Sequence, residues 1–137
     1  MGMYTELNIA VEVANEPKVI EILKYMLGDI TEKPELFEHS LFKSDRWEFM
    51  LVSDSYYFDG QTDSKLFEDN LYKDKPMYFL NVRCNLKNYN NEIDKFLDWL
   101  CPYIKSYGFI GYKRYEEEDE PTLIYIKGNN VEYKNQN

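Results

Sequence analysis

The fold is decided by residues 76–108, which read PMYFLNVRCNLKNYNNEIDKFLDWLCPYIKSYG. Apolar and polar side chains alternate over residues 76–88, a pattern typical of a strand that rests one face on a hydrophobic core. We therefore expect a buried strand here. The side chains predicted to face the core are Tyr78, Leu80, Val82, Cys84 and Leu86.

An amphipathic helix is predicted to follow this strand, with Asn90 or Asn91 as its N-cap. Pro102 removes one backbone hydrogen bond inside the helical pattern, which predicts a kink or a restarted last turn. Gly108 is expected to end the helix. The apolar stripe consists of Ile93, Phe96, Leu97, Leu100, Tyr103 and Ile104.

A first strand and a first helix are predicted upstream. Residues 4–13, YTELNIAVEV, alternate strictly, so a strand with one buried face is expected there. Asn15 then has the character of an N-cap, with Pro17 in the first helical turn. Gly28 stands where a left-handed residue would close that helix.

The chain between these two units is less regular. Residues 29–45 predict a long connector, and connectors of this length often carry function. Residues 46–58, RWEFMLVSDSYYF, predict a second strand, whereas residues 65–75 fit either a short edge strand or an ordered loop. The side chains sharing one face of the strand at 46–58 would be Trp47, Phe49 and Leu51.

A returning hairpin is expected after the second helix. Residues 109–115 and 121–127 read as two strands, and the acidic run between them, Glu116 to Glu120, is their turn. A brief final strand is expected at residues 131–133, in a tail that is partly frayed from about residue 129.

This order of elements predicts an α+β fold. Its best fit is a ferredoxin-like sandwich, in which two helices cover one face of an antiparallel sheet of about five strands. The strands at residues 4–13 and 76–88 would be the central antiparallel pair, and the last strand would extend one edge. No linker interrupts the pattern, so residues 1–137 are expected to form a single domain.

Composition narrows the classes of partner. The formal net charge of −9 disfavours nucleic-acid binding and docking to an anionic membrane, because both use basic surfaces. It permits a basic protein partner, although the need for solubility alone explains such a charge. Two cysteines, no secretory signal and no apolar run of about 20 residues predict a cytoplasmic protein with reduced thiols.

Motifs for catalysis and for cofactors are not found in this sequence. His39 is the only histidine, and it has no neighbouring pattern of Cys, Asp or Glu, so neither a zinc site nor a catalytic site is expected. Cys84 and Cys101 lie on apolar positions and are expected to be buried and inert. The sequence therefore predicts no metal, no cofactor and no catalytic residue.

The candidate binding residues lie on the sheet face opposite the helices. Asn81, Arg83 and Asn85 would form a shallow polar platform there, beside the polar face of residues 4–13. Aromatic and basic side chains around the predicted second strand would suit a protein interface. These additional candidates are Arg46, Trp47 and Tyr57.

Three segments carry a resemblance. The segments RWEFML, SYYF and NLKNYNNEIDKFLDWL resemble the sequences of a family of small uncharacterised bacterial and phage-associated proteins. The likeness spans most of residues 3–127. It implies a bacterial or prophage setting, and it transfers no functional residue.

These observations favour a non-enzymatic binding module that engages a protein partner, or a second copy of itself, through the open sheet face. One alternative is a small-molecule sensor or enzyme with a pocket near the 29–45 connector. Another is an acidic inhibitor that mimics nucleic acid, for which the net charge of −9 is modest.

Overall fold

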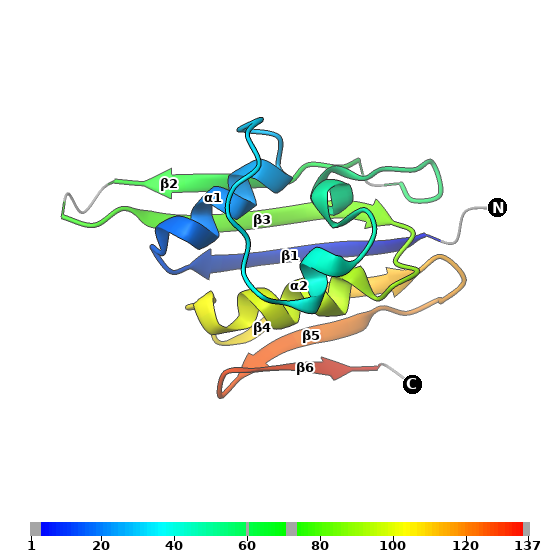
Figure 1. The fold of residues 1–137 in the computed structure, drawn as a ribbon. Helices are drawn as coiled ribbons and strands as arrows, with labels where there is room; N and C mark the ends of the chain where they lie inside the picture. The colour runs from blue at the N-terminus through cyan, green and yellow to red at the C-terminus, as the bar shows by residue number, and fades with distance from the viewer. Residues whose placement is uncertain (1–3, 60, 71–73, 136–137) are drawn as a thin grey trace.

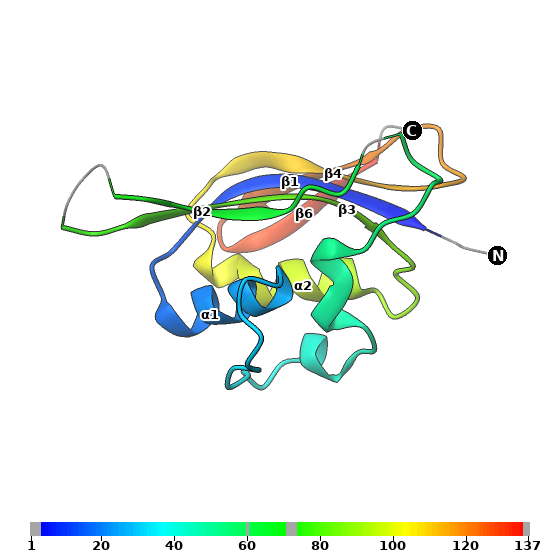
Figure 2. The same ribbon diagram turned by 90° about the horizontal axis from the view of Figure 1, so that it is seen from above.

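A computed structural model describes residues 4–59, 61–70 and 74–135. Within these residues one antiparallel sheet of six strands has the order β2-β3-β1-β4-β5-β6. Two α-helices and three short 3-10 helices lie against one of its faces (Figures 1 and 2). The strands are β1 (Thr5–Val13), β2 (Lys65–Asp69), β3 (Met77–Leu86), β4 (Gly108–Tyr115), β5 (Thr122–Lys127) and β6 (Asn130–Lys134). The helices are α1 (Pro17–Met26), η1 (Ser40–Lys43), η2 (Trp47–Val52), α2 (Glu92–Leu100) and η3 (Cys101–Tyr103).

The α+β class and the placement of both α-helices on one face confirm the expectation, although the sheet has six strands instead of about five. The predicted neighbours β1 and β3 are paired and antiparallel, with Leu7 opposite Cys84 and Asn8 opposite Arg83. The last strand, β6, extends the sheet at one edge. Among the described residues, no helix has the length and apolarity that a membrane crossing requires.

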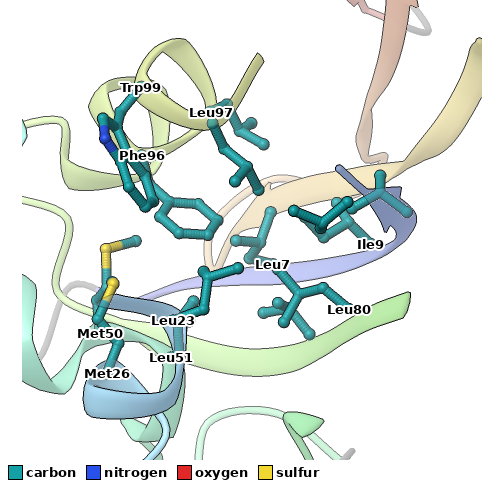
Figure 3. Close-up of a cluster of buried hydrophobic side chains, with 14 of the residues drawn as sticks. Leu7, Ile9, Leu23, Met26, Met50, Leu51, Leu80, Phe96, Leu97 and Trp99 are labelled. Carbon is teal, nitrogen blue, oxygen red and sulfur yellow. The ribbon is translucent and has the colours of Figure 1, made fainter. Parts of the chain in front are cut away.

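Burial alternates along the central strands as the sequence predicts. Every second residue of β1 from Thr5 to Val13 is buried, because these side chains pack against the helices. Figure 3 shows Leu7 and Ile9 of β1 facing Leu97 and Phe96 of α2. The largest fully buried side chains form this core: Leu7, Ile9, Ile22, Leu23, Met26, Leu41, Met50, Leu51, Leu80, Ile93, Phe96 and Leu97.

The predicted second strand at residues 46–58 is wrong. Arg46 has a left-handed backbone with φ 66°, and the chain then forms the 3-10 helix η2. Trp47, Met50 and Leu51 are buried, whereas Phe49 is 66% exposed, which is helical spacing and not alternation. The strand that pairs with β3 is instead β2. It lies in residues 65–75, for which the sequence allows either an edge strand or a loop.

Both α-helices begin and end slightly differently from the prediction. The N-cap of α1 is Glu16 instead of Asn15, and Gly28 closes the helix with φ 80° as expected. Asn91 is the N-cap of α2, but it makes no side-chain cap; the Asn88 side chain accepts the Ile93 N–H at 2.9 Å in its place.

The last turn of the second helix restarts at the proline. Helix α2 stops at Leu100, and the 3-10 helix η3 contains Pro102. This confirms the predicted restart, because a proline N–H is missing from the helical ladder. Gly108 does not end the helix. It has φ 87° and begins β4, after residues 104–107 have left the helical conformation.

A bulge lets β4 lie directly against β1. The register between β4 and β5 shifts between Phe109 and Gly111. Gly111 has φ 152°, and a Cβ atom there would lie 1.9 Å from the backbone oxygen of Asn8. Only glycine permits this approach of the two backbones. The bulge therefore supports the join between the first three strands and the C-terminal hairpins.

Candidate functional site

The sheet face opposite the helices carries a surface that we call the platform. Figure 2 shows no helix on this side of the sheet. Phe67 of β2 is 47% exposed and lies opposite half-buried Phe79 of β3. Phe109 of β4 is 58% exposed, and its ring packs against that of Tyr125, with centroids 5.6 Å apart. The platform consists of Asn8, Ala10, Phe67, Phe79, Asn81, Arg83, Phe109, Tyr112, Leu123 and Tyr125.

Two of the predicted binding residues lie on the platform. Asn81 and Arg83 are exposed and stand opposite Ala10 and Asn8 of β1, which the sequence predicts as the neighbouring strand. Asn85 shares their face but is buried. Its backbone N–H donates to the Ser53 carbonyl at 3.2 Å, and its side-chain amide lies 3.4 Å from an Asp54 carboxylate oxygen.

The segment from residue 53 to residue 59 explains that burial. It passes over one end of the open face and places Phe58 in a buried position. The Arg114 guanidinium lies 5.2 Å from the centre of the Phe58 ring, and the same guanidinium donates to Glu6 at 2.9 Å. The platform is consequently limited to the uncovered part of the sheet, away from Asn85.

The other three predicted residues lie elsewhere. Trp47 is buried beneath the connector, and its ring meets Phe42 edge-on with centroids 4.8 Å apart. Arg46 lines a cavity of about 470 Å³ together with Phe49 and Lys87. The Tyr57 ring stacks on the Tyr56 ring, and its centroid lies 5.5 Å from that of the Tyr4 ring. The structure therefore does not bring the six predicted residues into one site.

A second surface is a groove of about 840 Å³ between the connector, α2 and the β5–β6 hairpin. We call it the α2 groove. One wall comes from residues 37–40, another from α2 and η3, and the third from residues 129–133. It adjoins the 29–45 connector, where the alternative hypothesis places a pocket.

His39 holds the connector against α2 at the mouth of this groove. Its Nδ1 accepts the backbone N–H of Leu41 at 3.0 Å, so Nε2 carries the proton and donates to the Asp98 carboxylate at 2.8 Å. The histidine thus has the acidic partner that the sequence did not reveal. Both of its ring nitrogens are occupied, so its role in this geometry is to fix the connector.

A second polar cluster joins β4, α2 and β6 across the groove. Lys113 donates to Asp94 at 2.7 Å, and its ammonium lies 4.4 Å from the centre of the Tyr133 ring. Burial raises the pKa of the Tyr133 hydroxyl well above its usual value, and the negative charges of Asp94 and Asp98 raise this pKa further. These contacts set the position of β6 relative to the helix.

Trp99 forms part of the groove wall and is almost fully buried. Its indole nitrogen has no hydrogen-bond partner among the described residues. Figure 3 places this nitrogen on the ring edge that faces away from Leu97. The rings of Phe37 and Phe42 pack on Trp99 at 6.0 and 5.3 Å, so its burial rests on aromatic packing.

The described residues contain no group of three or more His, Cys, Asp or Glu side chains that could hold a metal ion. Cys84 and Cys101 are both free and buried. Burial raises the pKa of the Cys84 thiol to about 12, which makes it a poor nucleophile at neutral pH.

No family model, curated protein or solved structure matches this chain. The resemblance to small bacterial and phage-associated proteins stays a prediction.

The sequence missed the α2 groove because its walls come from three separated segments. One local signal was available. Asp94 and Asp98 are four residues apart, which places both carboxylates on one face of the predicted helix. Nothing in the sequence showed that His39 and Tyr133 would lie beside that face.

Proposed function

We propose that this protein is a non-enzymatic interaction module that binds another protein, or a second copy of itself, through the platform. The observation that carries the proposal is the exposure of Phe67 and Phe109 on a sheet face that no helix of the described residues covers. Exposed aromatic side chains with arginine nearby are enriched in protein interfaces. Arg83 supplies that basic side chain on the same face.

Charge supports the choice of this surface. Glu6 and Glu12 of the open face are paired, with Arg114 at 2.9 Å and Lys105 at 3.6 Å respectively. The acidic run Glu116–Glu120 lies instead at the turn between β4 and β5. The platform thus does not share the acidic excess of the chain, so a second acidic copy could approach it without strong repulsion.

The fold supports an interaction role as well. The segment from β1 to β4 has the element order β-α-β-β-α-β and the strand order β2-β3-β1-β4. We infer a ferredoxin-like core that β5 and β6 extend on one side. Such a core leaves one sheet face without helices, and that face is the platform. Two buried free thiols support a cytoplasmic location.

A double variant, Phe67→Ser with Phe109→Ser, tests the platform. We expect the wild-type protein to self-associate with rising concentration in sedimentation velocity, or to form a stable complex with a protein captured from a lysate. The double variant should lose that association while keeping its unfolding midpoint, because both rings are already half exposed.

The matched control is Tyr107→Ser. Tyr107 is 78% exposed and precedes β4, outside the platform. It should leave association unchanged. The proposal fails if the double variant and the wild type sediment alike at every concentration and capture the same proteins.

A further inference from the structure

We propose that the α2 groove and the free edge of β6 bind an extended, basic peptide segment of another protein, which adds to the sheet as a seventh strand. This inference goes beyond the platform, because it uses the helix side of the sheet and a different set of residues. Strand addition at an exposed sheet edge is a known mode of peptide recognition.

The edge of β6 is available for such pairing. Among the described residues β6 is the terminal strand of the sheet, and it pairs with β5 on one side. The turn between them has two central residues, Gly128 and Asn129, with φ 55° and 65°, which is the conformation of a tight hairpin. In this turn Lys127 and Asn130 form the first hydrogen-bonded pair.

That register decides which backbone groups point outward. Hydrogen-bonded and non-hydrogen-bonded pairs alternate along an antiparallel ladder. Val131 opposite Ile126 and Tyr133 opposite Ile124 are therefore the non-hydrogen-bonded pairs. The N–H and C=O groups of Val131 and Tyr133 face away from β5, towards an added strand.

The α2 groove lies where the side chains of an added strand would fall. Val131 and Tyr133 line it, and α2 forms its opposite wall. A peptide bound at the β6 edge would direct alternate side chains to the helix side of the sheet, because strand side chains alternate between faces. The groove would then hold the peptide side chains on the helix side, and hydrogen bonds to the β6 backbone would set the register of the peptide.

Charge identifies the side chains that this groove would accept. Three carboxylates line it, from Glu38, Asp94 and Asp98, together with the ammonium of Lys95. Lys113 pairs with Asp94 at 2.7 Å, and Lys43 lies 3.8 Å from Glu38. Among the described residues Asp98 has no lysine or arginine partner, so its charge is the one left for a ligand. The side chain of Asp98 remains 79% exposed although one of its oxygens accepts from His39. Lysine or arginine at alternate positions of the peptide would complement this charge.

The probe is a capped peptide of about eight residues, a typical strand length, that alternates lysine with threonine. A peptide with glutamate in place of lysine is its control. We expect the lysine peptide to bind and to protect the Val131 and Tyr133 amides from hydrogen exchange. The glutamate peptide should not bind.

Two variants of the protein separate the backbone contribution from the charge contribution. Val131→Pro removes an N–H that points outward, so the fold should survive while peptide binding is lost. Asp98→Asn keeps an acceptor for His39 but removes the charge, and it should weaken binding about two- to five-fold. Asp119→Asn makes the same charge change in the β4–β5 turn and should have no effect.

Three results would overturn the proposal. The lysine peptide fails to bind, or it binds Val131→Pro as well as wild type, or Asp98→Asn and Asp119→Asn weaken it equally. Sedimentation that shows a dimer sensitive to Val131→Pro would assign the edge to a second copy instead. The platform double variant should bind the peptide normally, so this proposal and the platform proposal can fail separately.

Discussion

The platform and the α2 groove lie on opposite faces of one sheet and differ in shape and charge. The platform is a broad surface of half-exposed rings, and two of the acidic side chains on its face are paired with basic ones. The groove is concave, is lined by three carboxylates and ends at a strand edge. A broad aromatic surface suits a folded partner, whereas a groove beside an edge strand suits a single extended segment.

The difference also concerns what holds each surface in place. The platform rests on strand pairing alone, from β2 to β5. The groove depends on side-chain contacts between distant segments, chiefly His39 with Asp98 and Lys113 with Asp94. Substitutions should therefore damage the two surfaces separately, except where they break the sheet itself.

The largest effect is expected from Gly111→Ala, which should damage both surfaces. The new Cβ would collide with the Asn8 carbonyl oxygen, which belongs to rigid backbone. We expect a loss of about 3 kcal/mol or more in the free energy of unfolding, measured by urea denaturation. Gly128→Ala is the matched control. Its φ is also positive, but no atom of the described residues lies within 4 Å of its Cβ position, so a loss of only about 1 kcal/mol is expected. Equal losses would contradict the role assigned to the bulge.

An intermediate effect is expected from His39→Ala, which should loosen the α2 groove and spare the platform. The change removes the bond to Asp98 and the cap on the Leu41 N–H, with a loss of about 1–2 kcal/mol in unfolding free energy. Limited proteolysis should then cut the connector more readily. His39→Asn can keep the cap without the bond to Asp98, so it should recover part of the loss. No recovery would mean that the cap contributes little.

A smaller effect on stability is expected from Phe109→Ser alone, which touches only the platform. The ring is 58% exposed and contacts Tyr125, so the unfolding free energy should change by about 0.5 kcal/mol or less. Thermal unfolding measures this. A large destabilisation would show that the platform rings are structural, and would remove the main support for their role in binding.

The smallest effect at neutral pH is expected from Tyr133→Phe. The pKa of Tyr133 is raised in the folded protein, so its contribution is fully present below the unfolded pKa of about 10 and is lost as pH rises above that value. Wild type should therefore lose stability faster than Tyr133→Phe above pH 10. Chemical denaturation across that range measures the difference between the two proteins. Parallel curves would contradict the raised pKa of this hydroxyl.

Much of the fold could be predicted from local pattern. The alternation in β1 and β3 identified both strands and their buried faces, and it placed their polar faces side by side. The register, with Asn8 opposite Arg83, came only from the structure. The platform follows from the same alternation, which is why Asn81 and Arg83 were found. The segment at residues 53–59 that buries Asn85 has no such period, so its path over the sheet could not be predicted.

The wrong strand prediction at residues 46–58 and the failure to predict the groove both have physical reasons. Trp47, Phe49 and Leu51 fit a strand by alternation, whereas Trp47, Met50 and Leu51 fit a helical turn equally well. The left-handed backbone at Arg46 starts the helical turn. Arginine rarely adopts this conformation, so nothing in the sequence indicated it. The groove was missed because His39 and Asp98 are 59 residues apart and meet only through tertiary packing.

The position of β1 inside the sheet has a consequence for folding during synthesis. β1 is the first strand of the chain, yet its partners are β3, which ends at Leu86, and β4, which ends at Tyr115. A nascent chain must therefore carry an apolar strand with both edges unpaired until β3 has left the ribosome. Such long-range pairing slows folding and exposes the chain to aggregation. After β3 has paired, β1 keeps one open edge until β4 emerges, so a chaperone that covers extended apolar segments would have most to protect before β3 is available.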